Sequence, residues 1–145
     1  MKRRSLVVLV ALTIALTAAA CSSSSASPSA AATGLEGTWQ WTASTEAVPA
    51  SQSVVPDPEN YTITFAADGT YTGKADCNQI SGTYTVDGSS LNIASGPTTL
   101  AACGEASLDA LYVAGLDKVA TYAISGDQVT MTFADDAGTM TFTKA

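Results

Sequence analysis

The chain has 145 residues, with six basic and 13 acidic side chains and no histidine. From Cys21 onward three lysines stand against all 13 acids, so this part carries 3 − 13 = −10, a charge that repels phosphate backbones and excludes nucleic acid as a partner. Without histidine, the usual serine or cysteine triad and the commonest general base are also excluded.

Residues 1–20 have the parts of a bacterial lipoprotein signal peptide. Positions 2–4 are basic, and positions 5–20 form an uncharged run built mainly of apolar residues. As a helix this run would reach only about 24 Å, short of the ~30 Å hydrocarbon core, so a permanent transmembrane anchor is the weaker alternative. The run ends in a sequence that resembles a lipobox, with Ala18 where leucine is usual, and we expect lipidation of Cys21.

Residues 21–34 comprise Cys21 and a tether rich in serine and alanine. The tether has no charge and no large apolar side chain, so nothing in it offsets the entropy of ordering. Two or three acyl chains bind a bilayer more firmly than one. We therefore expect a lipid-anchored protein on the cell membrane or outer membrane, facing the extracytoplasmic side. Residues 35–145 suit one domain with a single core, and we expect a monomer.

Strands are predicted next, because apolar and polar residues alternate between short turns. The alternation is clearest in residues 61–65, which lead into the Asp68-Gly69 pair typical of a hairpin turn. Recurrent threonine in this pattern suits an antiparallel sheet with one wet and one apolar face. Residues 49–58 are expected to form a loop. The predicted strands cover residues 38–45, 61–65, 70–75, 82–86, 91–94, 121–125, 128–133 and 139–143.

Cys77 and Cys103 are the two cysteines left in this region. In an oxidising compartment we expect them to form a disulfide, which would stabilise the fold by roughly 3 kcal/mol. Two alternatives remain open from the residues alone. One is a zinc site, which lacks further cysteine or histidine ligands, and the other is a pair of buried free thiols.

One segment, residues 105–119, breaks the alternation and is predicted to form an amphipathic helix. Its apolar residues recur at spacings of three and four. Gly115 inside it costs about 1 kcal/mol relative to alanine unless close packing needs a glycine. The apolar face is expected to cover one open end or face of the sheet. The apolar residues in question are Leu108, Leu111, Tyr112, Leu116 and Val119.

The central part of the chain has a specific pattern of residues that leads into the predicted helix. It consists of Gly73, Cys77, Asn78, Ser81, Gly82, Tyr84, Thr99 and Cys103. This pattern resembles the META domain family, which includes HslJ-like heat-inducible lipoproteins, and the resemblance covers about residues 35–145. It implies an α+β, β-rich fold, a curved antiparallel sheet or partly open β-barrel of about eight strands packed with one α-helix. It also implies a place in the cell envelope and a role in stress response, with no established catalytic residues, and a fold similar to that of pilot lipoproteins.

Several carboxylates are candidates for catalysis or for binding a metal ion. For each of them, a role as a solvated acid in a turn is the stronger hypothesis. Asp57 with Glu59, or Asp135 with Asp136, has the residue types of a glycosidase pair. Asp127 together with the 135–136 pair supplies oxygen ligands that suit Ca²⁺, although the spacing matches no known loop. We expect no catalytic residue, no metal and no cofactor.

Two residues are candidate contacts for a ligand or partner. Asn78 favours a fold role, because its side chain can bond nearby backbone, and contact with a ligand is the alternative. Trp39 and Trp41 share one face of the first strand, so at least one belongs to the core. If Trp41 lies at the sheet edge beside residues 49–58, it would line an apolar groove.

These observations favour a membrane-tethered, non-enzymatic binding or interaction module of the envelope. Its partners would be the membrane, through lipid on Cys21, and an envelope protein or a hydrophobic small molecule. The first alternative is a structural or assembly-factor lipoprotein of the pilot type. The second is an enzyme with an unrecognised site.

Overall fold

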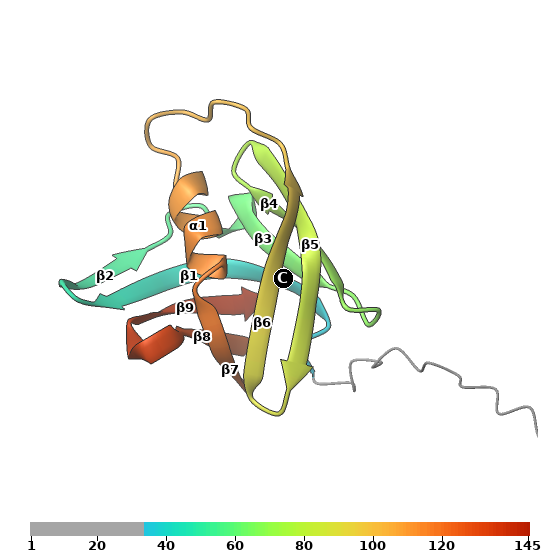
Figure 1. The fold of residues 1–145 in the computed structure, drawn as a ribbon. Helices are drawn as coiled ribbons and strands as arrows, with labels where there is room; N and C mark the ends of the chain where they lie inside the picture. Colours follow the sequence, from blue (N-terminus) through green and yellow to red (C-terminus); the bar gives the residue numbers. More distant parts are fainter. Residues whose placement is uncertain (1–33) are drawn as a thin grey trace, which may run out of the picture.

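Nine strands, one α-helix and two 3-10 helices make up residues 34–145, the part of the chain that the computed structural model describes (Figure 1). The expected signal peptide, Cys21 and nearly all of the tether lie outside these residues. Within them, no helix has the length and apolar character needed to cross a bilayer. In chain order the elements are β1 Gly37–Ala47, β2 Ala50–Val54, η1 Pro58–Asn60, β3 Tyr61–Phe65, β4 Thr70–Ala75, β5 Asn78–Asp87, β6 Ser90–Thr98, α1 Asp109–Leu116, β7 Val119–Ser125, β8 Gln128–Phe133, η2 Ala134–Asp136 and β9 Gly138–Lys144.

The strands form a closed antiparallel barrel. Each of β3 to β9 pairs with its neighbour in sequence, β3 pairs with β1, and β9 returns to β1, so eight strands complete the ring. The ninth, β2, pairs only with β1. The predicted β-rich α+β fold with about eight barrel strands and one helix is confirmed. The ring has one thin seam, because β6 and β7 share a single paired position, Ser90 with Thr121.

Alternation along the strands separates the core from the surface. On β3, Tyr61, Ile63 and Phe65 are buried, while the two threonines between them are half-buried on the other face. Such period-two burial follows from the pleat of a strand. The outer face carries cross-strand threonine pairs, such as Thr45 and Thr139, whose hydroxyl oxygens lie 2.7 Å apart. The largest fully buried side chains are Trp39, Trp41, Tyr112, Phe65 and Phe142.

A bulge in β1 changes which residues face the core. The register against β9 shifts between Trp41 and Ala43, which leaves Thr42 as the extra residue. Before the bulge Trp39 and Trp41 face inward with the ordinary period of two, and beyond it the inward position falls on Ser44, three residues after Trp41. On its other edge β1 pairs first with β3 and then, after the bulge, with β2.

The prediction that residues 49–58 form a loop is wrong for their first half. Ala50–Val54 is strand β2, paired with residues 43–47 of β1. All five residues of β2 are exposed, so the segment has no apolar alternation to identify it. It forms a strand because β1 is 11 residues long and extends past the end of β3.

The helix is also shorter than the predicted residues 105–119. Its N-terminal part is replaced by a turn, in which the Ser107 N–H bonds the Gly104 carbonyl, in a loop tied down by Cys103. At its C-terminal end Val119 is already in β7, paired with Phe133. Both ends are therefore set by contacts with distant parts of the chain.

Helix α1 packs into the interior of the barrel. Tyr112 and Leu116 are 0 % and 2 % exposed. Glycine is unfavourable inside a helix unless close packing requires it, and Gly115 is closely packed against Met140. A Cβ added at Gly115 would lie 2.6 Å from the Met140 sulfur, closer than the atoms allow.

The two ends of the barrel differ. The chain enters at the end that holds the β3–β4 and β5–β6 turns, where the Trp39 indole N–H donates to the Leu35 carbonyl at 2.7 Å. The β4–β5 turn with Cys77 and the start of α1 lie at the other end, because β4 and β5 run the length of the barrel. In Figure 1 the loop before α1 rises above the strands at this second end.

Candidate functional site

The thin seam between β6 and β7 opens into a groove. At the seam the Tyr122 N–H donates to the Ser89 carbonyl at 2.9 Å. Farther along β6 the end of α1 takes the place of a strand, and the Ser95 hydroxyl donates to the Asp117 carboxylate. The resulting groove has a volume of about 560 Å³. That volume is within the range of small-molecule sites.

The lining of this groove is largely apolar and reaches the core. Lys118 lies over the Phe133 ring, with Nζ 5.7 Å from the ring centre, so the cation covers an aromatic wall. Counting Lys118 against Asp87 and Asp117 gives 1 − 2 = −1. An apolar chain with a neutral or cationic head therefore suits the groove better than an anionic one. The lining residues are Thr85, Asp87, Ser90, Leu91, Asn92, Asp117, Lys118, Val119, Ala120, Phe133, Ala134 and Ala137.

Asn78, a candidate contact from the sequence, is a buried hydrogen-bond node. Its side-chain oxygen accepts bonds from the Ala101 N–H at 2.8 Å and the Thr99 hydroxyl at 3.1 Å. Its amide nitrogen donates to the Ala101 carbonyl and to the Asp109 carboxylate, both at 3.1 Å. With its side chain engaged in this way, Asn78 fixes the loop before α1 rather than presenting polar atoms to a ligand.

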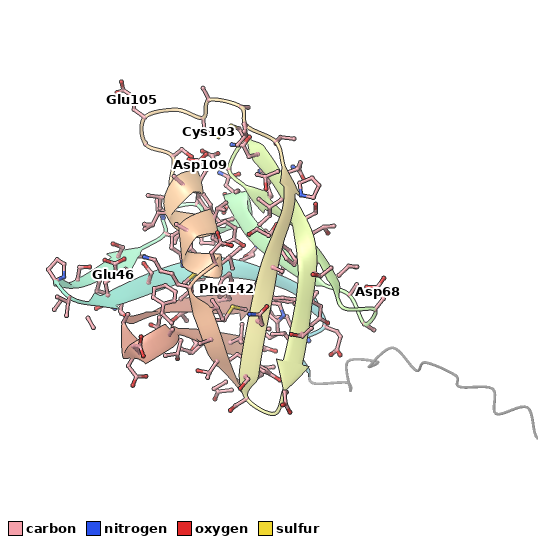
Figure 2. The ribbon with its side chains drawn as sticks, in the orientation of Figure 1. Glu46, Asp68, Cys103, Glu105, Asp109 and Phe142 are labelled. Atoms are coloured by element: carbon pink, nitrogen blue, oxygen red, sulfur yellow. A yellow bond between two sulfur atoms is a disulfide. The ribbon has the colours of Figure 1, made fainter. Side chains whose placement is uncertain are left out.

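Cys77 and Cys103 form a disulfide beside this node, with Cα atoms 5.7 Å apart. The zinc and free-thiol alternatives therefore do not apply to this structure. The bond joins the β4–β5 turn to the loop before α1. Figure 2 shows Cys103, Glu105 and Asp109 in succession along that loop and the start of the helix. The disulfide and Asn78 together anchor the N-terminal end of α1.

Trp41, the other candidate contact, lies in the core. Its side chain is 1 % exposed, and its indole N–H donates to the Ala43 carbonyl at 2.8 Å. The ring packs edge-on to Tyr61 and tilted against Tyr112, with centres 5.7 and 5.3 Å away. A cavity of about 10 Å³ beside it has room for about one water. Trp41 is therefore not at an exposed sheet edge, and the groove proposed for that case is not formed there.

Tyr112 carries a polar group into the core. Its hydroxyl is fully buried and, among the described residues, has no hydrogen-bond partner. Burial away from water raises the pKa of the Tyr112 phenol well above 10.0, and the nearby Tyr71 adds to the shift. Desolvation likewise raises the pKa of Tyr71. Both phenols are therefore neutral at physiological pH.

The aspartates proposed to bind calcium are not gathered into one site, and the four acids of the two proposed glycosidase pairs are exposed. No three metal-ligating side chains gather among residues 34–145. Asp127 lies in the turn before β8 and Asp135 in η2 after it, so the six residues of β8 hold them about 20 Å apart. The pKa of Asp68 is lowered by bonds from Thr70, which marks a turn capped by its own neighbour.

The sequence carries no signal for the groove at the seam. Alternation predicts Leu91 in a strand and the helical spacing predicts Val119 in the helix, whereas the opening between them depends on β6 and β7 sharing one pair. A groove made by two strands that diverge is a property of pairing, which local alternation does not encode.

Three comparisons place the chain among known proteins. The model of the family described as META domain matches residues 32–145. The fold is similar to the crystal structure of a DUF4847 family protein from Bacteroides vulgatus, with a TM-score of 0.61 and 19% identity over 75% of this chain and 92% of that one. It is also similar to the NMR structure of a protein from Burkholderia xenovorans, with a TM-score of 0.62 and 21% identity over 77% of this chain and 83% of that one. No curated protein matches the sequence.

Proposed function

We propose that this chain, which belongs to the META domain family, is a membrane-tethered binding module that takes an apolar or amphipathic molecule into the groove between β6 and β7. It is anchored by lipid on Cys21 and acts without catalysis on the extracytoplasmic side of the cell membrane or outer membrane. A role in envelope stress response is part of the proposal.

The observation that carries the binding role is the groove itself. It is about 560 Å³ in volume, and its walls include the core side chains Leu91, Val119 and Phe133. An apolar chain lying there would remove surface from water on both partners, which is worth roughly 25 cal/mol per Å². No catalytic constellation accompanies it, since the polar residues at its rim are threonine, serine, asparagine, aspartate and one lysine.

The envelope location is supported by the lipobox and by the disulfide. The Cys77–Cys103 bond is of a kind that persists in oxidising compartments and is rare in the cytosol. The chain enters the barrel at the end opposite this disulfide. A tether on the membrane would therefore leave the disulfide end and the start of α1 facing outward.

Thermal denaturation in the presence of three amphiphiles tests the binding role. Dodecyltrimethylammonium, dodecyl maltoside and dodecanoate share one alkyl chain and differ in head-group charge. We expect the cationic and neutral compounds, each below its micelle concentration, to raise the melting temperature. At about a hundredfold excess over the dissociation constant the stabilisation is about 2.7 kcal/mol. The negative charge of the groove predicts the smallest shift with dodecanoate.

A pair of variants locates the binding. Ala120 lines the groove, so Ala120→Trp would fill it and abolish the shift. Ala123 is exposed on the same strand and does not line the groove, so Ala123→Trp would preserve the shift. Equal shifts in both variants, or no shift with any amphiphile, would overturn the binding role.

The anchor is tested separately by the intact mass of the mature N-terminus. A diacylglyceryl-modified Cys21 is expected, and Cys21→Ser should move the protein from the membrane to the soluble fraction. An unmodified N-terminus downstream of Cys21 would contradict the lipoprotein assignment and leave the groove proposal intact.

A further inference from the structure

We infer that the free edge of strand β2 is a second binding surface, which takes an extended basic segment of a partner protein as an added β-strand. The site is separate from the groove at the β6–β7 seam, since none of its residues lines that groove. Binding at this edge is therefore independent of binding in the groove. Figure 1 shows β2 at the margin of the molecule, beyond β1.

The hydrogen bonds around β1 fix which backbone groups of β2 are free. The Ala47 N–H bonds the Ala137 carbonyl, so Ala47 and, by alternation, Thr45 and Ala43 direct their backbone groups toward β9. Ser44 and Glu46 must then bond β2, where they are paired with Ser53 and Ser51. The Val55 N–H bonds the Thr42 carbonyl, which agrees with this alternation on the β2 side.

The remaining residues of β2 direct their backbone groups away from β1. These are Ala50, Gln52 and Val54, and no other described strand pairs with β2. A strand edge of this kind is a ready-made template for another chain, because each outward N–H can donate to an added strand and each outward C=O can accept from it. Natural edge strands are usually protected by a charged side chain or a bulge. β2 has neither in its sequence Ala-Ser-Gln-Ser-Val.

Apolar side chains stand at both ends of this edge. Val48 is 90% exposed in the turn before β2, and Val54 is 75% exposed at its last position. Pro49 and Pro56 flank the strand, and since proline cannot donate to a ladder they limit the edge to about five residues. The matching partner segment is thus short and extended, with apolar side chains at its ends.

Charge decides what kind of segment fits. Residues 43–59, which include β2 and its flanking turns, contain the acids Glu46, Asp57 and Glu59 and no base, which gives 0 − 3 = −3 for this segment. The whole described region carries −10, so pairing with a second copy would bring two strongly negative domains together. A basic segment is attracted by the same charges. The occupant is therefore a lysine- or arginine-bearing strand of another protein and not a second copy of this chain.

The test uses full-length protein, purified in mild detergent, and seven-residue capped peptides in which valine alternates with a charged residue. The lysine peptide should bind and slow hydrogen exchange at the amides of Gln52 and Val54. A glutamate peptide of the same pattern should not bind. A lysine peptide with alternate amides N-methylated should lose at least about tenfold in affinity, because it cannot complete the ladder.

A matched pair of variants assigns the site. Gln52→Pro removes the central outward N–H while leaving the bonds to β1 in place, and it should weaken the lysine peptide at least about tenfold. Gln52→Thr keeps that N–H and should bind normally. Unchanged melting temperatures show that both variants fold. The inference is overturned if the lysine peptide fails to bind at millimolar concentration, if protection appears elsewhere, if Gln52→Pro binds normally, or if the free protein already dimerises through β2.

Discussion

The Asn78 side chain pairs with the backbone of Ala101 in both directions, accepting from its N–H at 2.8 Å and donating to its carbonyl at 3.1 Å. The buried Asn78 amide thus makes, with the loop before α1, the pair of hydrogen bonds that a neighbouring strand would otherwise make. The same side chain reaches the first residue of α1, Asp109. The position of the helix in the barrel therefore depends on a residue of β5.

Replacing Asn78 with alanine should be strongly destabilising. It leaves backbone groups of Ala101 unpaired and removes the bond to Asp109, so we expect a loss of about 2–4 kcal/mol in the free energy of unfolding. Urea denaturation measures it. Gln79→Ala, which truncates an exposed neighbour, is the control and should change little. A small effect of Asn78→Ala would contradict the role of Asn78 as a node.

Removing the disulfide should cost a similar amount. In the chain-entropy model, a bond that spans 26 residues stabilises the fold by about 3.5 kcal/mol. The double variant Cys77→Ser with Cys103→Ser should therefore denature at lower urea, and the wild-type protein should match it once reduced. If reduction leaves the wild-type midpoint unchanged, the loop before α1 is held by other contacts alone.

Removing the hydroxyl of either of two tyrosines in one aromatic cluster should change the free energy of unfolding in opposite directions. Tyr61→Phe removes the acceptor of the Leu108 N–H, which lies 2.9 Å away, and should destabilise by about 1 kcal/mol. Tyr112→Phe removes a buried hydroxyl without a partner among the described residues, and should stabilise by up to about 1 kcal/mol. Chemical denaturation of both variants measures the contrast. Destabilisation by Tyr112→Phe would mean that its hydroxyl has a partner, such as a buried water.

Stability should fall at alkaline pH. Desolvation raises the pKa of Tyr112 in the folded state well above 10.0, and to a lesser extent that of Tyr71. Between 10.0 and the raised values the unfolded chain loses protons that the folded chain keeps, so the free energy of unfolding decreases as pH rises through this window. Below 10.0 the contribution is fully present. Urea midpoints across this window should show a shallower decline in Tyr112→Phe, and an identical decline would refute the assignment.

Gly115 tests whether packing outweighs helix propensity. Alanine is about 1 kcal/mol better than glycine inside a helix, but its Cβ would lie 2.6 Å from the Met140 sulfur. Because Met140 is buried, we expect Gly115→Ala to destabilise by about 1–3 kcal/mol. Gly104→Ala, whose Cβ would meet nothing within 4 Å, should be neutral. Stabilisation by Gly115→Ala would show that the helix shifts at little cost.

Local pattern in the sequence determined most of the barrel. Period-two alternation placed strands 61–65, 70–75 and 128–133 at the bounds that the structure has, because side chains of a strand face core and solvent in turn. The cysteine count also predicts the bond between Cys77 and Cys103, which the structure confirms. Strand β2 has no such signal, because its five residues are all exposed and so carry no alternation.

Tertiary structure alone decided the length of α1, the burial of Trp41 and both proposed binding surfaces. The helix is shortened by the disulfide at Cys103 and by the pairing of Val119 with Phe133. Trp41 lies in the core because β1 pairs with β9 at this point, with Trp41 opposite Phe142. The groove and the free edge arise where strands diverge or run past one another. Pairing between segments that are distant in the sequence creates these features. Alternation along one segment indicates which side chains face the core, but it does not indicate which strand pairs with that segment.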